Sequence, residues 1–141
     1  MKIDHLAIWV TDLEIVREFY ETYFHATSGL KYVNEKNKFE SYFLSFKGGA
    51  RLELMSKIPM PIDRQQNKPY KPGLAHFAIS VGSRENVLKK TEELRSMGYQ
   101  VAGEPRQTGD GYFESIVLDP EGNMIEITVD RSKGTFGISE Y

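Results

Sequence analysis

Two stretches of the chain begin with histidine and then run in step, HLAIWVTDLEIV at residues 5–16 and HFAISVGSRENV at residues 76–87. Both read His-x-Ala-Ile-x-Val and continue into polar residues and a helical pattern. Each is followed by a glycine-marked turn and a strand-like segment, GGARLELM at 48–55 and EGNMIEIT at 121–128. The histidines are 71 residues apart, and the matching glutamates, Glu53 and Glu126, are 73 apart. A register kept this closely over half the chain predicts an internal duplication.

Each repeat is expected to fold as a strand, a helix and three further strands, which predicts an α+β fold of two tandem βαβββ modules. The first repeat reads as a strand at 3–10, a helix at about 12–25, and strands near 29–35, 39–47 and 50–56. The second reads as a strand at 74–82, a helix at about 84–97, and strands near 99–105, 112–118 and 123–129. Thr11 and Glu14 match a capping box at the first helix, and Gly98 is placed to end the second helix.

We therefore expect one domain at residues 1–130, made of a first module and a second module joined by a linker. Its parts are the first module at 1–56, a proline-rich linker at 57–73 and the second module at 74–130, followed by a polar tail at 131–141. The linker contains four prolines, so it is not expected to form a regular element.

Side chains alternate between the two faces of a strand, and this places one strong metal ligand on the same face of each of four strands. The four residues are His5, Glu53, His76 and Glu126. The opposite faces are aliphatic and suit a covering helix. Carboxylates on the inner face of a sheet need a partner, and a cation serves two of them at once. The set of two imidazoles and two carboxylates predicts one divalent ion: Zn²⁺, Ni²⁺, Co²⁺, Mn²⁺ or Fe²⁺.

Composition excludes several classes of function. The sequence has no cysteine, which excludes disulfides, thiolate nucleophiles and cysteine-based metal sites. The formal net charge is -2, so no basic field would recruit nucleic acid. No apolar run approaches the ~20 residues of a membrane span. The start, MKIDHLAIWV, lacks the apolar stretch of a signal peptide, so a cytoplasmic location is expected.

At these residues the sequence resembles the vicinal oxygen chelate superfamily, which includes glyoxalase I, fosfomycin-resistance proteins, extradiol dioxygenases, methylmalonyl-CoA epimerase and bleomycin-resistance proteins. The resemblance covers about residues 1–130 and is specific at HLAIWVTDL, RLELM, LAHFAISV and LDPEGNMIEI. It implies paired modules forming a cupped mixed sheet around a metal. The ligand order His, Glu, His, Glu is that of glyoxalase I, whereas dioxygenases and fosfomycin-resistance proteins use only the two histidines and the last glutamate, and the epimerase has glutamine at the position of Glu53.

The resemblance implies a lyase or isomerase acting on a small α-hydroxycarbonyl or thiol-adduct substrate through a metal-stabilised enediolate. Glu126, or else Glu53, would detach from the metal and act as the base. Where bacterial glyoxalase I has an arginine and an asparagine that recognise glutathione, this sequence has Trp9 and Lys57. These departures argue against the usual glutathione contacts.

Four further residues are candidates for contact with the substrate, and each has a structural alternative. Trp9 shares the face of His5 and would line the pocket or pack in a core. Arg51 and Lys57 share the face of Glu53 and would hold an anion or remain solvated. Tyr112 follows Gly109-Asp110-Gly111 and would belong to a lid or to ordinary packing.

Two other functions remain open, a thiol transferase of the fosfomycin-resistance type and a non-enzymatic drug-binding protein. An oxygenase would need iron and would leave Glu53 without a role. The modules pair within one chain or are exchanged between two chains. Because a single module leaves open sheet edges, a homodimer is expected.

Overall fold

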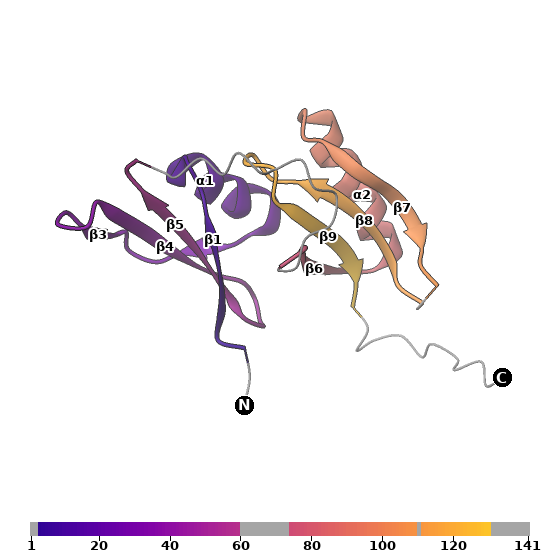
Figure 1. The fold of residues 1–141 in the computed structure, drawn as a ribbon. Coiled ribbons are helices and arrows are strands. Elements are labelled where there is room, and N and C mark those ends of the chain that lie inside the picture. Colours follow the sequence, from indigo (N-terminus) through magenta and orange to yellow (C-terminus); the bar gives the residue numbers. More distant parts are fainter. Residues whose placement is uncertain (1–2, 60–73, 110, 131–141) are drawn as a thin grey trace. The chain divides into compact units, whose positions relative to one another are not determined.

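The computed structural model describes residues 3–59, 74–109 and 111–130, which divide between two compact units, Met1–Pro72 and Gly73–Tyr141. We call these units module 1 and module 2. Each contains a mixed sheet with one helix packed on it (Figure 1). This confirms the α+β fold of two βαβββ modules. Most of the predicted linker and all of the predicted tail lie outside the described residues, so the proposed domain boundaries stay predictions.

The elements follow the predicted order. Module 1 contains β1 (His5–Trp9), α1 (Leu13–Phe24), β2 (Thr27–Ser28), β3 (Tyr32–Asn34), β4 (Phe39–Ser45) and β5 (Arg51–Lys57). Module 2 contains β6 (Phe77–Gly82), α2 (Arg84–Ser96), β7 (Val101–Gln107), β8 (Phe113–Leu118) and β9 (Met124–Val129). In the described part of the chain, neither helix has the length and apolar character needed to cross a membrane.

The first and last strands of each module lie side by side and run parallel. The strand order is β1-β5-β4-β2 in module 1, with β3 also paired to β4, and β6-β9-β8-β7 in module 2. The β1–β5 and β6–β9 pairs are parallel, and the remaining pairs are antiparallel. Parallel neighbours need a long crossover between them, and here the helix and the inner strands supply it. The topology therefore brings each histidine-bearing segment beside its glutamate-bearing strand.

Each module has its own apolar core between helix and sheet. In module 1, α1 buries an apolar stripe that includes Val16 and Tyr20, against the fully buried Leu44 and Leu54 of β4 and β5. In module 2, α2 packs on β7, β8 and β9, where the buried side chains are Val87, Leu94, Val117, Ile125 and Ile127. The aliphatic faces predicted to lie under a helix are buried in β5 and β9, and the aliphatic face of β6 is half-buried.

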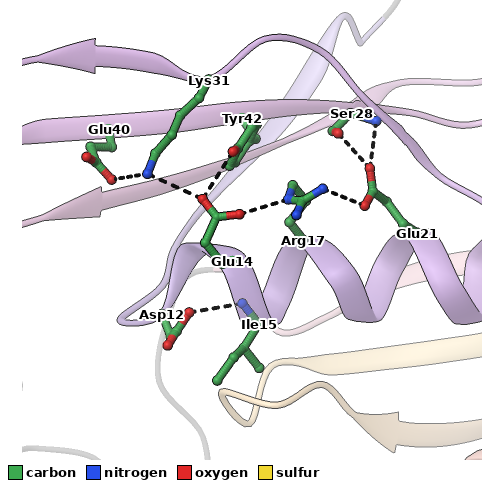
Figure 2. Close-up of polar contacts among 9 residues, drawn as sticks. All are labelled: Asp12, Glu14, Ile15, Arg17, Glu21, Ser28, Lys31, Glu40 and Tyr42. Atoms are coloured by element: carbon green, nitrogen blue, oxygen red, sulfur yellow. Dashed lines mark hydrogen bonds and ion pairs between the residues drawn. The ribbon is translucent and has the colours of Figure 1, made fainter.

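The N-terminal cap of α1 is Asp12 rather than Thr11. The Asp12 carboxylate accepts a hydrogen bond from the Ile15 amide at 2.9 Å (Figure 2). The capping-box prediction is therefore wrong by one residue, because Asp12 is itself a strong cap and satisfies a free amide of the first turn. The end of α2 is as predicted, since Gly98 follows the helix with a φ of 90°.

Glu14, which the capping box would have used, instead ties α1 to the sheet of module 1. Its carboxylate accepts a hydrogen bond from the Tyr42 hydroxyl at 3.1 Å and pairs with Lys31 at 3.3 Å and with Arg17 at 3.1 Å (Figure 2). Burial acts to raise the pKa of Glu14, but these hydrogen bonds prevail and bring it below its ordinary value. The network lies on the helix side of β4, away from the histidine and glutamate pair.

The predicted strand at 29–35 is in fact two short strands, β2 and β3, both paired with β4. Ser28 lies opposite Leu44, and Tyr32 lies opposite Ser41. The chain therefore advances four residues from Ser28 to Tyr32, while β4 advances only three between their partners. The extra residue breaks the ladder as a bulge does, and Leu30, within it, is 97% exposed. The pattern of polar and apolar residues in the predicted strand at 29–35 does not reveal this added residue.

Candidate metal centre

Module 1 brings His5 and Glu53 together on one face of its sheet. His5 begins β1, Glu53 lies in the middle of β5, and the ladder pairs Ala7 with Glu53. The His5 Nε2 atom is 3.8 Å from the Glu53 Oε2 atom. The histidine side chain is 39% exposed and the glutamate side chain 15%, so the carboxylate lies deeper than the ring.

Module 2 repeats this arrangement with His76 and Glu126. The ladder pairs Ala78 of β6 with Glu126 of β9, the counterpart of the Ala7–Glu53 pairing. The His76 Nε2 atom is 3.1 Å from the Glu126 Oε1 atom, and the side chains are 43% and 17% exposed. His76 directly precedes β6, whereas the prediction placed it within a strand from 74 to 82, because the β6–β9 ladder begins only at Phe77.

The predicted division of the strand faces holds around both pairs. Leu52 and Leu54, on either side of Glu53 along β5, are buried, as are Ile125 and Ile127 on either side of Glu126 along β9. The aliphatic neighbours therefore face the helix. The ligand candidates face the opposite side, where they remain within reach of solvent.

Both pairs have the ligand chemistry that a divalent ion requires, and their spacing can be compared with that of two ligands on one ion. Ligand atoms about 2.1 Å from one ion and at right angles to each other lie about 3 Å apart. The 3.1 Å separation in module 2 matches this value, and the 3.8 Å separation in module 1 is somewhat wider. Within the described ranges, no cluster of three or more His, Asp or Glu side chains capable of holding a metal occurs. A site of four ligands drawn from both modules therefore stays a prediction.

Trp9 and Lys57 lie on the ligand-bearing face of module 1. Trp9 is 52% exposed, with its ring edge-on to Phe39 at a centroid distance of 6.1 Å. Lys57 is exposed and pairs in the ladder with Phe39. Trp9 is thus available as a wall residue and is not part of the buried core of module 1.

Arg51 points toward neighbouring side chains of module 1. Its Nη2 atom is 2.6 Å from the Asp4 Oδ2 atom, and its guanidinium carbon lies 4.5 Å from the centroid of the Phe43 ring. These contacts combine an ion pair with a cation–π interaction. The predicted role of Arg51 in binding a substrate anion stays a prediction.

Tyr112 belongs to the tight connection between β7 and β8. Its amide donates to the Thr108 hydroxyl at 3.0 Å, and its carbonyl accepts from the Thr108 amide at 2.8 Å. The Gln107 side chain donates to the same carbonyl at 3.0 Å. The backbone at Tyr112 is therefore well bonded, and its contact with substrate stays a prediction.

Two polar features of the ligand-bearing faces were missed in the sequence. In module 1, the Asp4 Oδ2 atom is 3.0 Å from the His5 Nδ1 atom. Hydrogen bonding to His5, and then to Arg51, lowers the pKa of Asp4. A metal-binding histidine usually donates its second ring N–H to a carboxylate, a carbonyl or water, and Asp4 directly precedes His5 in the sequence.

In module 2, Glu114 of β8 and Thr128 of β9 lie opposite each other and are both buried. Thr128 shares the face of Glu126, because side chains two residues apart in a strand lie on the same face. Glu114 is on this face as well, because it is the ladder partner of Thr128. Among the described residues, the Thr128 hydroxyl is the buried side-chain polar atom without a hydrogen-bond partner. The alternation in FESIVL would have revealed Glu114 as a carboxylate on this face.

A chain of two βαβββ modules, each with a His–Glu pair on its open sheet face, has the architecture of the metal-chelating proteins that it resembles in sequence. Residues 2–127 match the model of the Glyoxalase/Bleomycin resistance protein/Dioxygenase superfamily. The chain therefore belongs to this superfamily.

Known relatives agree with this assignment. The chain is 28% identical over 126 residues to the uncharacterized protein YqjT of Bacillus subtilis (strain 168), covering 87% of this chain and 94% of the relative. A mutant of glyoxalase I from Zea mays is 25% identical with a TM-score of 0.71; the match covers 92% of this chain but only 45% of the maize chain. The trypanothione-dependent glyoxalase I of Leishmania major is 21% identical with a TM-score of 0.71, over 94% and 88% of the two chains, and this likeness concerns the fold.

Proposed function

We propose that the protein is a divalent-metal-dependent lyase or isomerase of the glyoxalase I type, acting on a small α-hydroxycarbonyl or thiol-adduct substrate. The observation that carries the proposal is the matched pair of His Nε2–Glu carboxylate contacts, at 3.8 Å in module 1 and 3.1 Å in module 2. Both pairs occupy corresponding positions of a duplicated unit. The likeness to the glyoxalase I chain from maize supports this branch of the superfamily.

The four side chains at these positions would hold one ion: His5, Glu53, His76 and Glu126. Imidazole and carboxylate together suit Zn²⁺, Ni²⁺, Co²⁺, Mn²⁺ or Fe²⁺. When bound, such an ion supplies Lewis-acid polarisation of the neighbouring oxygens of the substrate, which makes the carbon-bound proton between them more acidic.

The proton is moved by a carboxylate of the protein, and we assign this role to Glu126. An isomerisation needs one group that accepts a proton from the carbon bearing the hydroxyl and returns it to the adjacent carbonyl carbon. The side chains of Glu126 and Glu53 are 17% and 15% exposed, so few waters compete with the substrate for the oxygens of either. Glu53, its counterpart in module 1, would act as a fixed ligand and is the second choice for the base.

The remaining candidates would contact the body of the substrate. Trp9 offers an exposed aromatic surface on the face of His5, and Lys57 offers a cation at the end of the strand that carries Glu53. Tyr112 would contribute from the β7–β8 connection. Trp9 and Lys57 stand where bacterial glyoxalase I has residues that recognise glutathione. This difference favours a substrate other than the common glutathione adduct.

Proton exchange in D₂O tests this function whichever product is formed. Full-length protein would be stripped with a chelator, reloaded with Ni²⁺, Co²⁺ or Zn²⁺, and incubated with hydroxyacetone, glyceraldehyde or hemithioacetals of methylglyoxal with several thiols. We expect loss of the α-proton NMR signal of at least one compound, dependent on the added metal. Protein that holds a stoichiometric metal ion and exchanges none of these protons would contradict the proposal.

We also propose that the chain forms a homodimer. In the described parts of the sheets, β1 is paired on one side only, to β5, and β6 only to β9. Unpaired strand edges favour pairing with another strand. These edges would pair either within one chain or between two.

A further inference from the structure

Asp4 holds the ring of His5 from the side away from Glu53. One oxygen of this carboxylate, Oδ2, is 3.0 Å from the His5 Nδ1 atom and 2.6 Å from the Arg51 Nη2 atom. The other ring nitrogen, Nε2, is the atom that faces Glu53. The two nitrogens of His5 therefore have separate partners on opposite sides of the ring.

The nature of these partners decides which nitrogen carries the proton. An ionised carboxylate only accepts hydrogen bonds, so a neutral His5 bonded to Asp4 has its hydrogen on Nδ1. This leaves a lone pair on Nε2, which is the form of the ring that binds a metal ion. The pairing of a ligand histidine with a carboxylate is a general means of fixing both the tautomer and the orientation of the ring.

Asp4 is itself fixed in place. The Arg51 side chain donates to its carboxylate, and the Arg51 amide donates to the Asp4 carbonyl at 3.0 Å. Arg51 also lies over the ring of Phe43, and the same ring meets His5 edge-on at a centroid distance of 5.2 Å. His5, Asp4, Arg51 and Phe43 thus form one connected set, whose geometry does not depend on a single exposed contact.

The sequence of module 2 has no carboxylate at the position that matches Asp4. Ala75 stands before His76 at the position that Asp4 takes before His5. The duplication preserved the His–Glu pair in both modules but the acidic neighbour in only one. His5 is therefore held in advance by a side-chain partner that the sequence of module 2 does not provide at the same place.

We propose that Asp4, anchored by Arg51, is a positioning residue that keeps His5 in its Nδ1-protonated form with Nε2 directed toward the divalent ion. The inference rests on the proposed function for the identity of that ion. It assigns Arg51 to the support of the metal ligand through Asp4.

The first test is made on the metal-free full-length protein, so it does not depend on the proposed function. Long-range ¹H–¹⁵N NMR correlations report which nitrogen of each histidine carries hydrogen. We expect His5 to be Nδ1-protonated in the natural protein and to shift toward the Nε2-protonated form in Asp4→Ala, with the His76 signals unchanged. A natural protein in which His5 is already Nε2-protonated would overturn the proposal.

The second test measures Zn²⁺ affinity by competition with a chromophoric chelator. Asp4→Ala is expected to weaken binding by about 10–100-fold, as loss of such a partner generally does. Asp4→Asn, which retains an accepting oxygen, is expected to lose less. Glu104→Gln removes the same charge from an exposed ion pair with Arg95 in module 2 and is expected to leave the affinity within about twofold.

The outcomes separate this inference from the proposed function. Thermal unfolding of each variant shows whether module 1 is intact before affinities are compared. Unchanged Zn²⁺ affinity in a folded Asp4→Ala protein would overturn the positioning role while leaving the metal site standing. A natural protein that binds no Zn²⁺, Ni²⁺ or Co²⁺ would overturn the proposed function and the metal-directing part of this inference, and the tautomer of His5 would then decide only its structural part.

Discussion

Replacing Glu126 with glutamine is expected to slow metal-dependent α-proton exchange by about 10²–10⁴-fold, the usual contribution of a general base. Glutamine keeps an oxygen on the same stem, so its shape and one possible ligand atom are retained. It cannot accept a proton at neutral pH. The rate would be measured in D₂O at saturating metal, with the metal content of each sample determined in parallel.

Glu53→Gln is the matched comparison, because Glu53 occupies the same place in module 1. If Glu126 is the base, the Glu53 variant should lose metal affinity but retain a larger share of the exchange rate once metal is saturating. Equal rates for natural and Glu126→Gln protein, at equal metal content, would contradict the assignment of the base. A larger loss in Glu53→Gln would transfer that role to Glu53.

The second large effect is expected from the two cores. Leu54→Ala in β5 and Ile127→Ala in β9 each remove a fully buried side chain between sheet and helix. Each change is expected to lower the free energy of unfolding by about 2–5 kcal/mol, because the lost burial is accompanied by a cavity. Urea denaturation followed by circular dichroism would measure the loss.

Met124→Ala provides the control for the core variants. Met124 lies in the same strand as Ile127 but on the opposite face and is 47% exposed. Its replacement is expected to change stability by no more than about 0.5 kcal/mol. If Met124→Ala costs as much as Ile127→Ala, the assignment of strand faces, and with it the position of Glu126, would be wrong.

Most of the fold could be predicted because the sequence repeats itself. The repeated His-x-Ala-Ile-x-Val motif located the first strand of each module, and the alternation around Glu53 and Glu126 indicated the correct buried faces. Those signals are local and periodic. The bulge at Leu30 was not predictable in the same way, because one added residue shifts the register without changing the residue types.

The predictions that were wrong concerned the exact residue at which a helix or a strand begins. Thr11 and Asp12 are both good caps, and only the backbone geometry at Asp12 decides between them. The strand at His76 begins later than predicted, since the β6–β9 ladder starts at the pair Phe77–Ile125. Strand ends depend on the partner strand, which a single segment of sequence does not specify.

The candidate site was predicted at the level of its ligands but not of their supports. The four ligands were predicted from the repeat and from the alternation of strand faces, and in the structure the first and last strands of each module are neighbours. The hydrogen bond from His5 to Asp4 and the anchoring by Arg51 depend on side-chain conformations that alternation does not encode. For the same reason, Arg51 was considered only for its charge toward a substrate.

The central claim is that one divalent ion is shared by ligands from both modules, and metal stoichiometry tests it most directly. Purified protein would be dialysed against Zn²⁺, Ni²⁺ or Co²⁺ and its metal content measured by elemental analysis, beside His5→Ala and His76→Ala variants. We predict one ion per chain, with affinity lost in either variant by more than the roughly 10–100-fold expected for a supporting residue. A natural protein without metal, or one with two ions per chain that each depend on a single module, would contradict the claim.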